Sequence, residues 1–158
     1  MRARGGDRDF PMQLILIFEE VFMKTRIAII TAEFNGSITK RMERIAEMHA
    51  ESIGVSVARK INVPGVYDLP LAAKKMLKLK DIDAVVVLGA VVQGGTSHDE
   101  VIANSTAKAL AELSLEFEKP VALGISGPRM TMQQAEERAG EYAKNAVNAA
   151  AKLVSALK

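Results

Sequence analysis

The stretch GAVVQGGTSHDEV, from Gly89 to Val101, gathers residues that could do chemistry. Gly94 and Gly95 allow the backbone to approach a ligand closely, because glycine adopts dihedral angles that other residues resist. Thr96 adds a hydroxyl group, and a helix expected from about His98 would present free N–H groups at the positive end of its dipole. The combination predicts an anion pocket of the kind that binds phosphate. A tight strand-to-helix turn that needs glycine and a capping hydroxyl is the alternative, and it stays open here.

His98 is one of only two histidines and stands at the start of that expected helix. The helix dipole disfavours the imidazolium cation there, whereas a bound phosphate would stabilise it. A group balanced between these two forms suits proton transfer, so we predict that His98 is a proton donor and acceptor. A solvated histidine that caps the helix is the alternative. His49, flanked by Glu47 and Glu51, is interpreted as a surface or flanking residue.

Four further residues could build a ligand site together with this loop. Phe34 lies in a predicted loop, where an aromatic ring can either stack on a flat heterocycle or plug the end of the core. Tyr67 offers an apolar wall, and Asp68 offers a carboxylate for hydroxyl groups or for capping the next helix. Arg138, in the segment EERAG, could bind phosphate, but on spacing alone we interpret it as an ordinary surface charge.

Apolar runs alternate with amphipathic segments, and this alternation predicts the elements that position these residues. Four runs are typical of strands: RIAIITA, VSVARKI, DAVVVLGAVV and PVALGIS. Four segments have helical spacing: SITKRMERIAEMHAESIG, DLPLAAKKMLKLK, the residues from about His98 to Phe117, and TMQQAEERAGEYAKNAVNAAAKLVSALK. Strands alternating with helices predict an α/β fold with a parallel sheet and right-handed crossovers.

Hydropathy predicts the order of the strands in this sheet. The first and third runs are the most apolar and belong at the centre, which gives the order 2-1-3-4 of a flavodoxin-like three-layer sandwich with helices on both faces. In such a sheet the chain reverses direction between strands 1 and 3 and opens a crevice at their carboxyl ends. The loops EFNGS, PGVYD and QGGTSH meet there, so we predict one ligand site lined by all three.

Composition excludes several classes of protein. The chain has 158 residues, 49% apolar and 25% charged, as an ordinary single domain does. Its net charge of +2 and its 4% of aromatic residues do not fit nucleic-acid binding. The absence of cysteine excludes disulfides and thiolate chemistry, and two distant histidines do not suggest a metal site. Because no apolar run reaches the ~18 residues that cross a bilayer, we expect a cytoplasmic protein without a membrane partner.

Residues 1–23 are expected to be an extension ahead of a domain that spans residues 24–158. The run LILIF, from Leu14 to Phe18, is too short for a signal peptide, and Glu19 interrupts it. Two alternatives stay open for this extension. It is either an artefact of start-codon choice, disordered in the protein, or it supplies an extra N-terminal strand that pairs with the sheet edge of a neighbouring subunit.

Five segments together resemble one family, the lumazine synthases, and especially its archaeal members: AEFN, VPGVYDLPLAAKK, LGAVVQGGTSHDEV, PVALGIS and AEERAG. The resemblance covers residues 24–158, in order and with the expected spacing. It implies a transferase of riboflavin biosynthesis that condenses 5-amino-6-(D-ribitylamino)uracil with 3,4-dihydroxy-2-butanone 4-phosphate, losing phosphate and water. It also implies that no metal or organic cofactor is needed.

The resemblance implies a role for each site residue. His98 would transfer protons, and Gly95, Thr96 and Arg138 would hold the phosphate. The ribitylaminouracil would contact Phe34, Val66, Tyr67, Asp68, Ala90, Val91, Val92 and Leu123. Members of the family form pentamers, some of them packed into 60-subunit shells, with each site between neighbours. Leu123 and Arg138 would therefore serve the site of the adjacent subunit.

Some positions depart from the family pattern. Leu123 stands where many bacterial members have an aromatic residue, so stacking on the pyrimidine would be one-sided. Gln93 replaces a frequent arginine, and AGEYAKNAV differs from the GTKAGNKG of many shell-forming members, which leaves pentamer and shell both open. Among rival interpretations, an archaeal riboflavin synthase would lack the loop that carries His98. A flavodoxin needs a phosphate loop rich in Ser and Thr after strand 1, and a receiver domain needs an aspartate at the end of strand 3.

Overall fold

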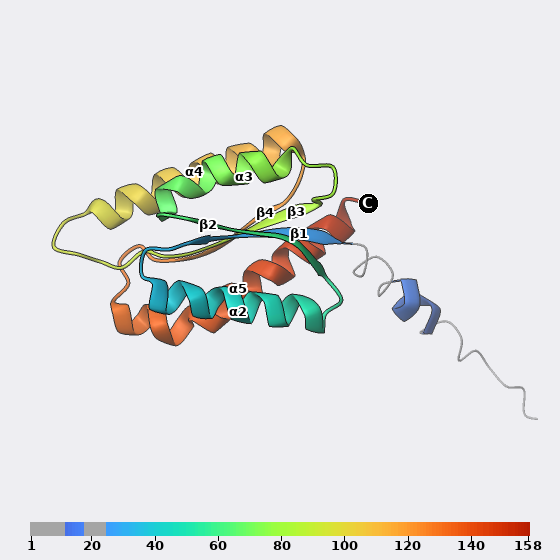
Figure 1. Cartoon of the computed structure of the whole chain (residues 1–158), viewed down its shortest axis with the longest axis horizontal. Coiled ribbons are helices and arrows are strands. Elements are labelled where there is room, and N and C mark those ends of the chain that lie inside the picture. The colour runs from blue at the N-terminus through green and yellow to red at the C-terminus, as the bar shows by residue number, and fades with distance from the viewer. Residues whose placement is uncertain (1–11, 18–24) are drawn as a thin grey trace, which may run out of the picture.

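The computed structural model describes residues 12–17 and 25–158. Its middle layer is a parallel sheet with the strand order β2-β1-β3-β4, which confirms the predicted order (Figure 1). The strands are β1 (Arg26–Ala32), β2 (Ser56–Val63), β3 (Ala84–Ala90) and β4 (Val121–Ser126). The helices are α2 (Gly36–Ser52), α3 (Leu69–Leu77), α4 (His98–Phe117) and α5 (Met132–Ala156), with a short 3-10 helix, η1 (Val66–Asp68), before α3. In Figure 1, α2 and α5 cover one face of the sheet, and α3 and α4 cover the other.

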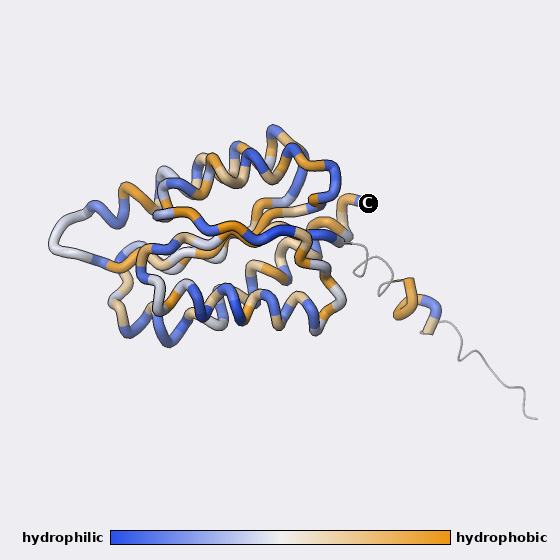
Figure 2. The backbone as a smooth tube through the Cα atoms, in the orientation of Figure 1, coloured by the Kyte–Doolittle hydropathy of each residue, from blue (hydrophilic) through white to orange (hydrophobic). Residues whose placement is uncertain are grey.

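The two central strands are apolar throughout because helices cover both of their faces. Every residue of β3 is buried, and so is every residue of β1 after Arg26. Alternate side chains enter the two cores: Ile27 and Ile29 pack towards α2 and α5, whereas Ala28 and Ile30 pack towards α3 and α4. Figure 2 shows apolar residues along the strands and polar residues on the outer sides of the helices.

α2 and α5 are also joined through a histidine. His49 is half-buried, and its Nε2 lies 2.8 Å from Oδ1 of Asn148 on α5, so the imidazole donates a hydrogen bond between the two helices. The half-buried position agrees with the interpretation of His49 as a surface or flanking residue, but its bond to Asn148 was not predicted. Glu47 and Glu51 suggested a solvated position, but the helix also turns this side chain towards α5, which sequence spacing within α2 does not reveal.

Residues 12–17 form a short helix, not the extra strand that was one alternative for Leu14–Phe18. A strand needs a neighbouring strand to pair its backbone groups, whereas a helix pairs part of them within its own segment. Its apolar side chains are exposed, from 54% at Leu14 to 61% at Met12. Phe18, residues 1–11 and the predicted boundary at residue 23 lie outside the described residues. Within the part of the chain that is described, no helix has the length and apolar character of a membrane span.

Candidate active site

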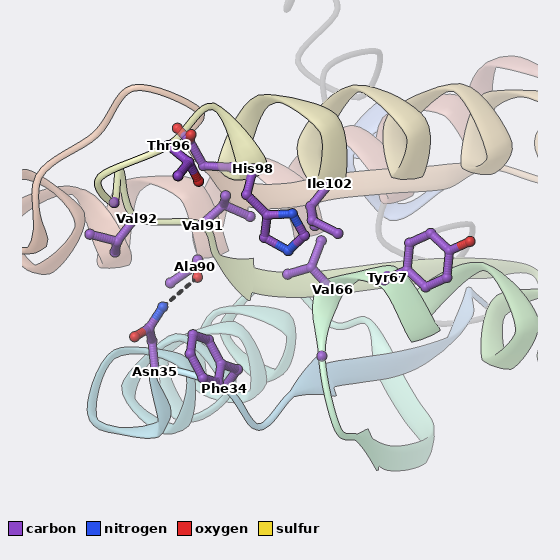
Figure 3. Close-up of a pocket in the computed structure, with 13 residues that line it drawn as sticks. Phe34, Asn35, Val66, Tyr67, Ala90, Val91, Val92, Thr96, His98 and Ile102 are labelled. Carbon is purple, nitrogen blue, oxygen red and sulfur yellow. Dashed lines mark hydrogen bonds between the residues drawn. The ribbon is translucent and has the colours of Figure 1, made fainter.

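A cavity of about 430 Å³ opens at the carboxyl edge of the sheet, where the three predicted loops meet (Figure 3). The loop after β1 contributes Phe34, and the loop after β2 contributes Val66 and Tyr67. The end of β3 and the loop after it contribute Ala90, Val91, Val92, Gly94 and Thr96, and α4 contributes His98. The prediction that these three loops meet is confirmed, since all three line one cavity. They do so because the carboxyl ends of parallel strands lie at the same edge.

The loop after β1 holds Phe34 at the cavity without burying it. Two backbone hydrogen bonds fix this loop against the end of β2, from Glu33 N to Val63 O at 2.8 Å and from Phe34 N to Pro64 O at 3.1 Å. Phe34 is 72% exposed, so it does not plug the core. An exposed aromatic ring beside a cavity is available for stacking on a flat ligand.

Asn35 also lines this cavity, although the sequence analysis did not single it out. Its backbone is left-handed, with φ of 60°, a conformation that asparagine tolerates better than most residues. Its Nδ2 donates a hydrogen bond of 2.8 Å to the carbonyl oxygen of Ala90, which ties the loop after β1 to the end of β3. An asparagine in the loop after a buried strand, directly before Gly36, was the signal available in the sequence.

The loop after β2 turns Asp68 away from the cavity and back onto its own backbone. Asp68 Oδ2 accepts a hydrogen bond of 2.9 Å from the N–H of Gly65, and Asp68 N donates to Gly65 O at 3.0 Å. Asp68 is exposed and does not line the cavity, whereas Val66 is buried beneath it and Tyr67 is exposed at its rim. Asp68 is the N-cap residue of α3, but its side chain makes no cap hydrogen bond there, so the prediction that it caps this helix is wrong. Its carboxylate instead caps η1 through the N–H of Gly65.

The glycine loop after β3 does not need glycine for its backbone conformation. Neither Gly94 nor Gly95 has a positive φ, and a Cβ atom added at either would meet nothing within 4 Å. Ser97 is the N-cap residue of α4, and its side chain makes no cap hydrogen bond. These observations count against a turn that requires glycine and a capping hydroxyl. They leave open space beside Thr96 and the helix N-terminus, where an anion could sit.

His98 is the first residue of α4 and is exposed to the cavity. Figure 3 shows its imidazole turned towards the cavity beside Val66 and Ile102. Ile102 lies one turn further along α4 and lines the same cavity, as the i, i+4 spacing requires. The spacing from His98 was the signal that could have identified it.

Four of the predicted site residues do not line this cavity: Asp68, Gly95, Leu123 and Arg138. Leu123 is 48% exposed on β4, an edge strand of the sheet. Arg138 is on α5, which covers the opposite face of the sheet from α4, and it lines a separate hollow of about 370 Å³. Within one chain, therefore, the imidazole of His98 and the guanidinium of Arg138 line different hollows. No group of three or more potential metal ligands occurs among residues 12–17 and 25–158.

Comparisons with known proteins point to one family. A family model described as 6,7-dimethyl-8-ribityllumazine synthase matches residues 24–158. The chain is 51% identical to the 6,7-dimethyl-8-ribityllumazine synthase of Methanocaldococcus jannaschii over 136 residues, covering 86% of this chain and 96% of that relative. It is 52% identical to the enzyme of the same name from Methanococcus maripaludis strain S2, covering 84% and 96% of the two chains. It is 48% identical to that from Methanothermobacter thermautotrophicus, covering 85% and 96%.

Proposed function

The chain belongs to the 6,7-dimethyl-8-ribityllumazine synthase family of riboflavin biosynthesis, and on this premise we propose that the cavity at the carboxyl edge of its sheet is the active site. There, 5-amino-6-(D-ribitylamino)uracil condenses with 3,4-dihydroxy-2-butanone 4-phosphate. The observation that carries the proposal is one cavity lined by an exposed aromatic ring, an open glycine loop and an imidazole. The cytoplasm, where the sequence analysis places the chain, is the proposed compartment.

The pyrimidine ring stacks on Phe34 in this proposal. The ring of Phe34 is exposed at the cavity, and stacking on a flat heterocycle covers apolar surface on both partners. Val66, Tyr67 and the segment 90–92 form the walls around the pyrimidine. Asp68 does not line the cavity, so the ribityl chain would have to extend beyond the cavity to hydrogen-bond with its exposed carboxylate, of which only Oδ2 is bonded to Gly65.

The phosphate group lies at the N-terminus of α4 in this proposal. Gly95 lies beside open space there and Thr96 follows it, and the positive end of a helix dipole is suited to an anion. A dianion also requires a cation with matching geometry, and a guanidinium provides one. Arg138 of a neighbouring subunit supplies this cation, since Arg138 of the same chain lines a different hollow.

His98 moves the protons that the condensation requires. When the aromatic amine attacks the ketone carbon, its nitrogen loses protons and the ketone oxygen gains them, so that water leaves and a C=N bond forms. Expulsion of phosphate requires a further proton transfer. An imidazole beside both substrates can accept and return these protons without a covalent intermediate, and the cavity contributes by holding the two reactants together.

The complete site requires a homo-oligomer, and we propose a pentamer, with a 60-subunit shell as the larger alternative. Leu123 is an exposed apolar side chain on an edge strand, where a neighbour can pack against it. In this arrangement Leu123 and Arg138 of one subunit face the cavity of the next. Mass measurement in solution distinguishes a pentamer from a shell, and a monomer that is fully active would contradict the proposal.

The two-substrate assay tests the function directly. Purified protein mixed with both substrates should form a fluorescent lumazine at the same rate with and without a chelator. His98→Ala should slow the reaction by about 10²- to 10⁴-fold, the usual contribution of a positioned acid–base group. Lys119→Met, at the opposite edge of the sheet, is the matched control and should keep the rate. No product from the wild-type chain, or an unchanged rate in His98→Ala, would refute the assignment.

A further inference from the structure

The first turn of α4 is bonded to the loop between β4 and α5 through one residue, Arg129. Asp99 Oδ2 accepts a hydrogen bond of 3.0 Å from the backbone N–H of Arg129, and the carboxylate of Glu100 pairs with the Nε of the same arginine. Glu100 raises the pKa of Arg129 above its ordinary value, so the guanidinium stays charged. Asp99 is only 7% exposed, which makes it a buried carboxylate with a defined partner.

The loop that Asp99 contacts is itself fixed against the segment after β3. Val91 N donates to Ser126 O at 2.9 Å, and Gln93 N donates to Met130 O at 2.8 Å. Gly127 has φ of 96°, and a Cβ atom there would lie 2.2 Å from the carbonyl oxygen of Val91. The loop therefore packs directly on the chain segment that walls the cavity.

Arg129 adopts a left-handed backbone, with φ of 58°, which is unfavourable for a residue with a side chain. Such a conformation persists only where surrounding contacts hold it, and residues of this kind gather at functional sites. Here the contacts are the carboxylates of Asp99 and Glu100. The first turn of α4 and the loop after β4 thus hold each other in place.

This link bears on His98 because His98 directly precedes Asp99 in the helix. Successive residues of a helix point about 100° apart around its axis. When the hydrogen bond of Asp99 holds the first turn of α4, it therefore also sets the direction in which the His98 side chain points. The residues just before the helix, 93–97, are exposed, and Ser97 makes no side-chain cap hydrogen bond that would fix the turn from the other side.

We propose that Asp99 is a positioning residue for His98, acting through its hydrogen bond to Arg129. The inference rests on the proposed role of His98 in proton transfer. Asp99 Oδ2 accepts the hydrogen bond from Arg129 N, and removing this acceptor leaves only the Glu100–Arg129 ion pair between the first turn of α4 and the loop after β4. The first turn is then less firmly held, and the imidazole spends less time directed at the reacting atoms. A small misplacement of a catalytic group lowers the chemical step much more than it lowers substrate binding.

Three variants test the proposal, and one of them is a matched control. Asp99→Ala removes the acceptor, whereas Asp99→Asn keeps an amide oxygen that can accept the same hydrogen bond. Asp83→Ala removes an analogous bond, 2.7 Å from Arg26 N to Asp83 Oδ2, at the amino edge of the sheet and far from the cavity. Both alanine variants should lower the melting temperature, so stability alone does not distinguish them.

Kinetics separate a positioning role from a merely structural one. Asp99→Ala should lower kcat by about 10- to 100-fold, with KM for the pyrimidine substrate within about twofold of wild type. Asp99→Asn should recover kcat to within about threefold, and Asp83→Ala should leave it unchanged. The proposal is overturned if Asp99→Ala keeps the wild-type kcat. It is also overturned if Asp99→Asn is as slow as Asp99→Ala, because the negative charge would then matter rather than the acceptor.

A second readout does not depend on activity. The chain has two histidines, so ¹³C labelling of histidine gives two imidazole signals, and His49→Gln assigns them. Asp99→Ala should shift or broaden the His98 signal, whereas Asp83→Ala should not. An unchanged His98 signal in Asp99→Ala would overturn the positioning role even in an active enzyme. If the wild-type chain makes no lumazine, the proposed function fails, and this spectrum still tests the link between Asp99 and His98.

Discussion

Complementation between two inactive variants tests whether the site is shared between subunits. In one chain, His98 lines the cavity at the carboxyl edge, whereas Arg138 lines a separate hollow on α5. In the proposed assembly, a complete site forms where the cavity of one subunit meets Arg138 of the next. His98→Ala and Arg138→Ala assemblies should each be nearly inactive when pure, because every site lacks one of the two groups.

In mixed assemblies some sites are intact, and their fraction can be calculated. Consider a ring whose subunits are drawn at random from equal amounts of the two variant chains. About one half of the cavities keep His98, and about one half of the neighbouring subunits keep Arg138. About one quarter of the sites therefore have both residues. Sites built within a single subunit would give no intact site, because each subunit carries one of the two substitutions. The expected activity is therefore about a quarter of the wild-type value in the first case and close to zero in the second.

Co-expression of the two variants provides the assay, with subunit composition measured by native mass spectrometry and product followed by fluorescence. The matched control mixes wild-type chains with the double variant His98→Ala/Arg138→Ala. Shared sites predict about one quarter of the wild-type activity for this control as well, whereas sites within one subunit predict about one half. A mixture of single variants no more active than the pure variants, with a control at one half, would refute the shared site.

Three further substitutions test individual features of the structure. Gly95→Ala should leave the melting temperature unchanged or slightly higher, because open space surrounds Gly95, while kinetics should show a higher KM for the butanone phosphate; an unchanged KM would contradict the proposed contact between Gly95 and the phosphate. Phe34→Ala should change the free energy of unfolding by less than ~0.5 kcal/mol because the ring is 72% exposed, yet weaken binding of the pyrimidine, measured by calorimetry, by about 1–3 kcal/mol. Equal affinity would exclude stacking. Lys119→Met should cost about 1–3 kcal/mol in urea unfolding, because Nζ donates to Leu77 O at 3.0 Å and to Leu79 O at 2.9 Å. A wild-type unfolding curve would show that these bonds contribute nothing.

The sheet could be predicted from the sequence because burial on two faces leaves a clear signature. The runs IAII in β1 and AVVVLGA in β3 are continuous and apolar, and both become central strands. β2 is partly exposed along its length and lies at an edge, as its polar residues indicate. Once the order of the strands was known, the loops that meet at the carboxyl edge followed from topology alone.

Most of the residues that line the cavity could be predicted from the sequence, but the bonds that hold them could not. Phe34 and His98 stand at strand and helix ends, so their place followed from the topology. The bonds from Asn35 to Ala90 and from Arg129 to Asp99 join residues 55 and 30 positions apart. Pairs at such separations depend on the path of each loop, and periodicity carries no information about that path.

The charge of the cavity connects assembly with catalysis. Among the described residues that line it there is no lysine or arginine, and its one carboxylate, Asp99, accepts a hydrogen bond from Arg129 N. The N–H groups at a helix N-terminus offer a phosphate dianion only partial positive charges. These favour binding far less than the full positive charge of a guanidinium held in position. A chain that must recognise a phosphate in this cavity therefore needs a cation from outside its own lining. In the proposed assembly Arg138 of a neighbour supplies that cation, so the phosphate substrate would be bound only where two subunits meet.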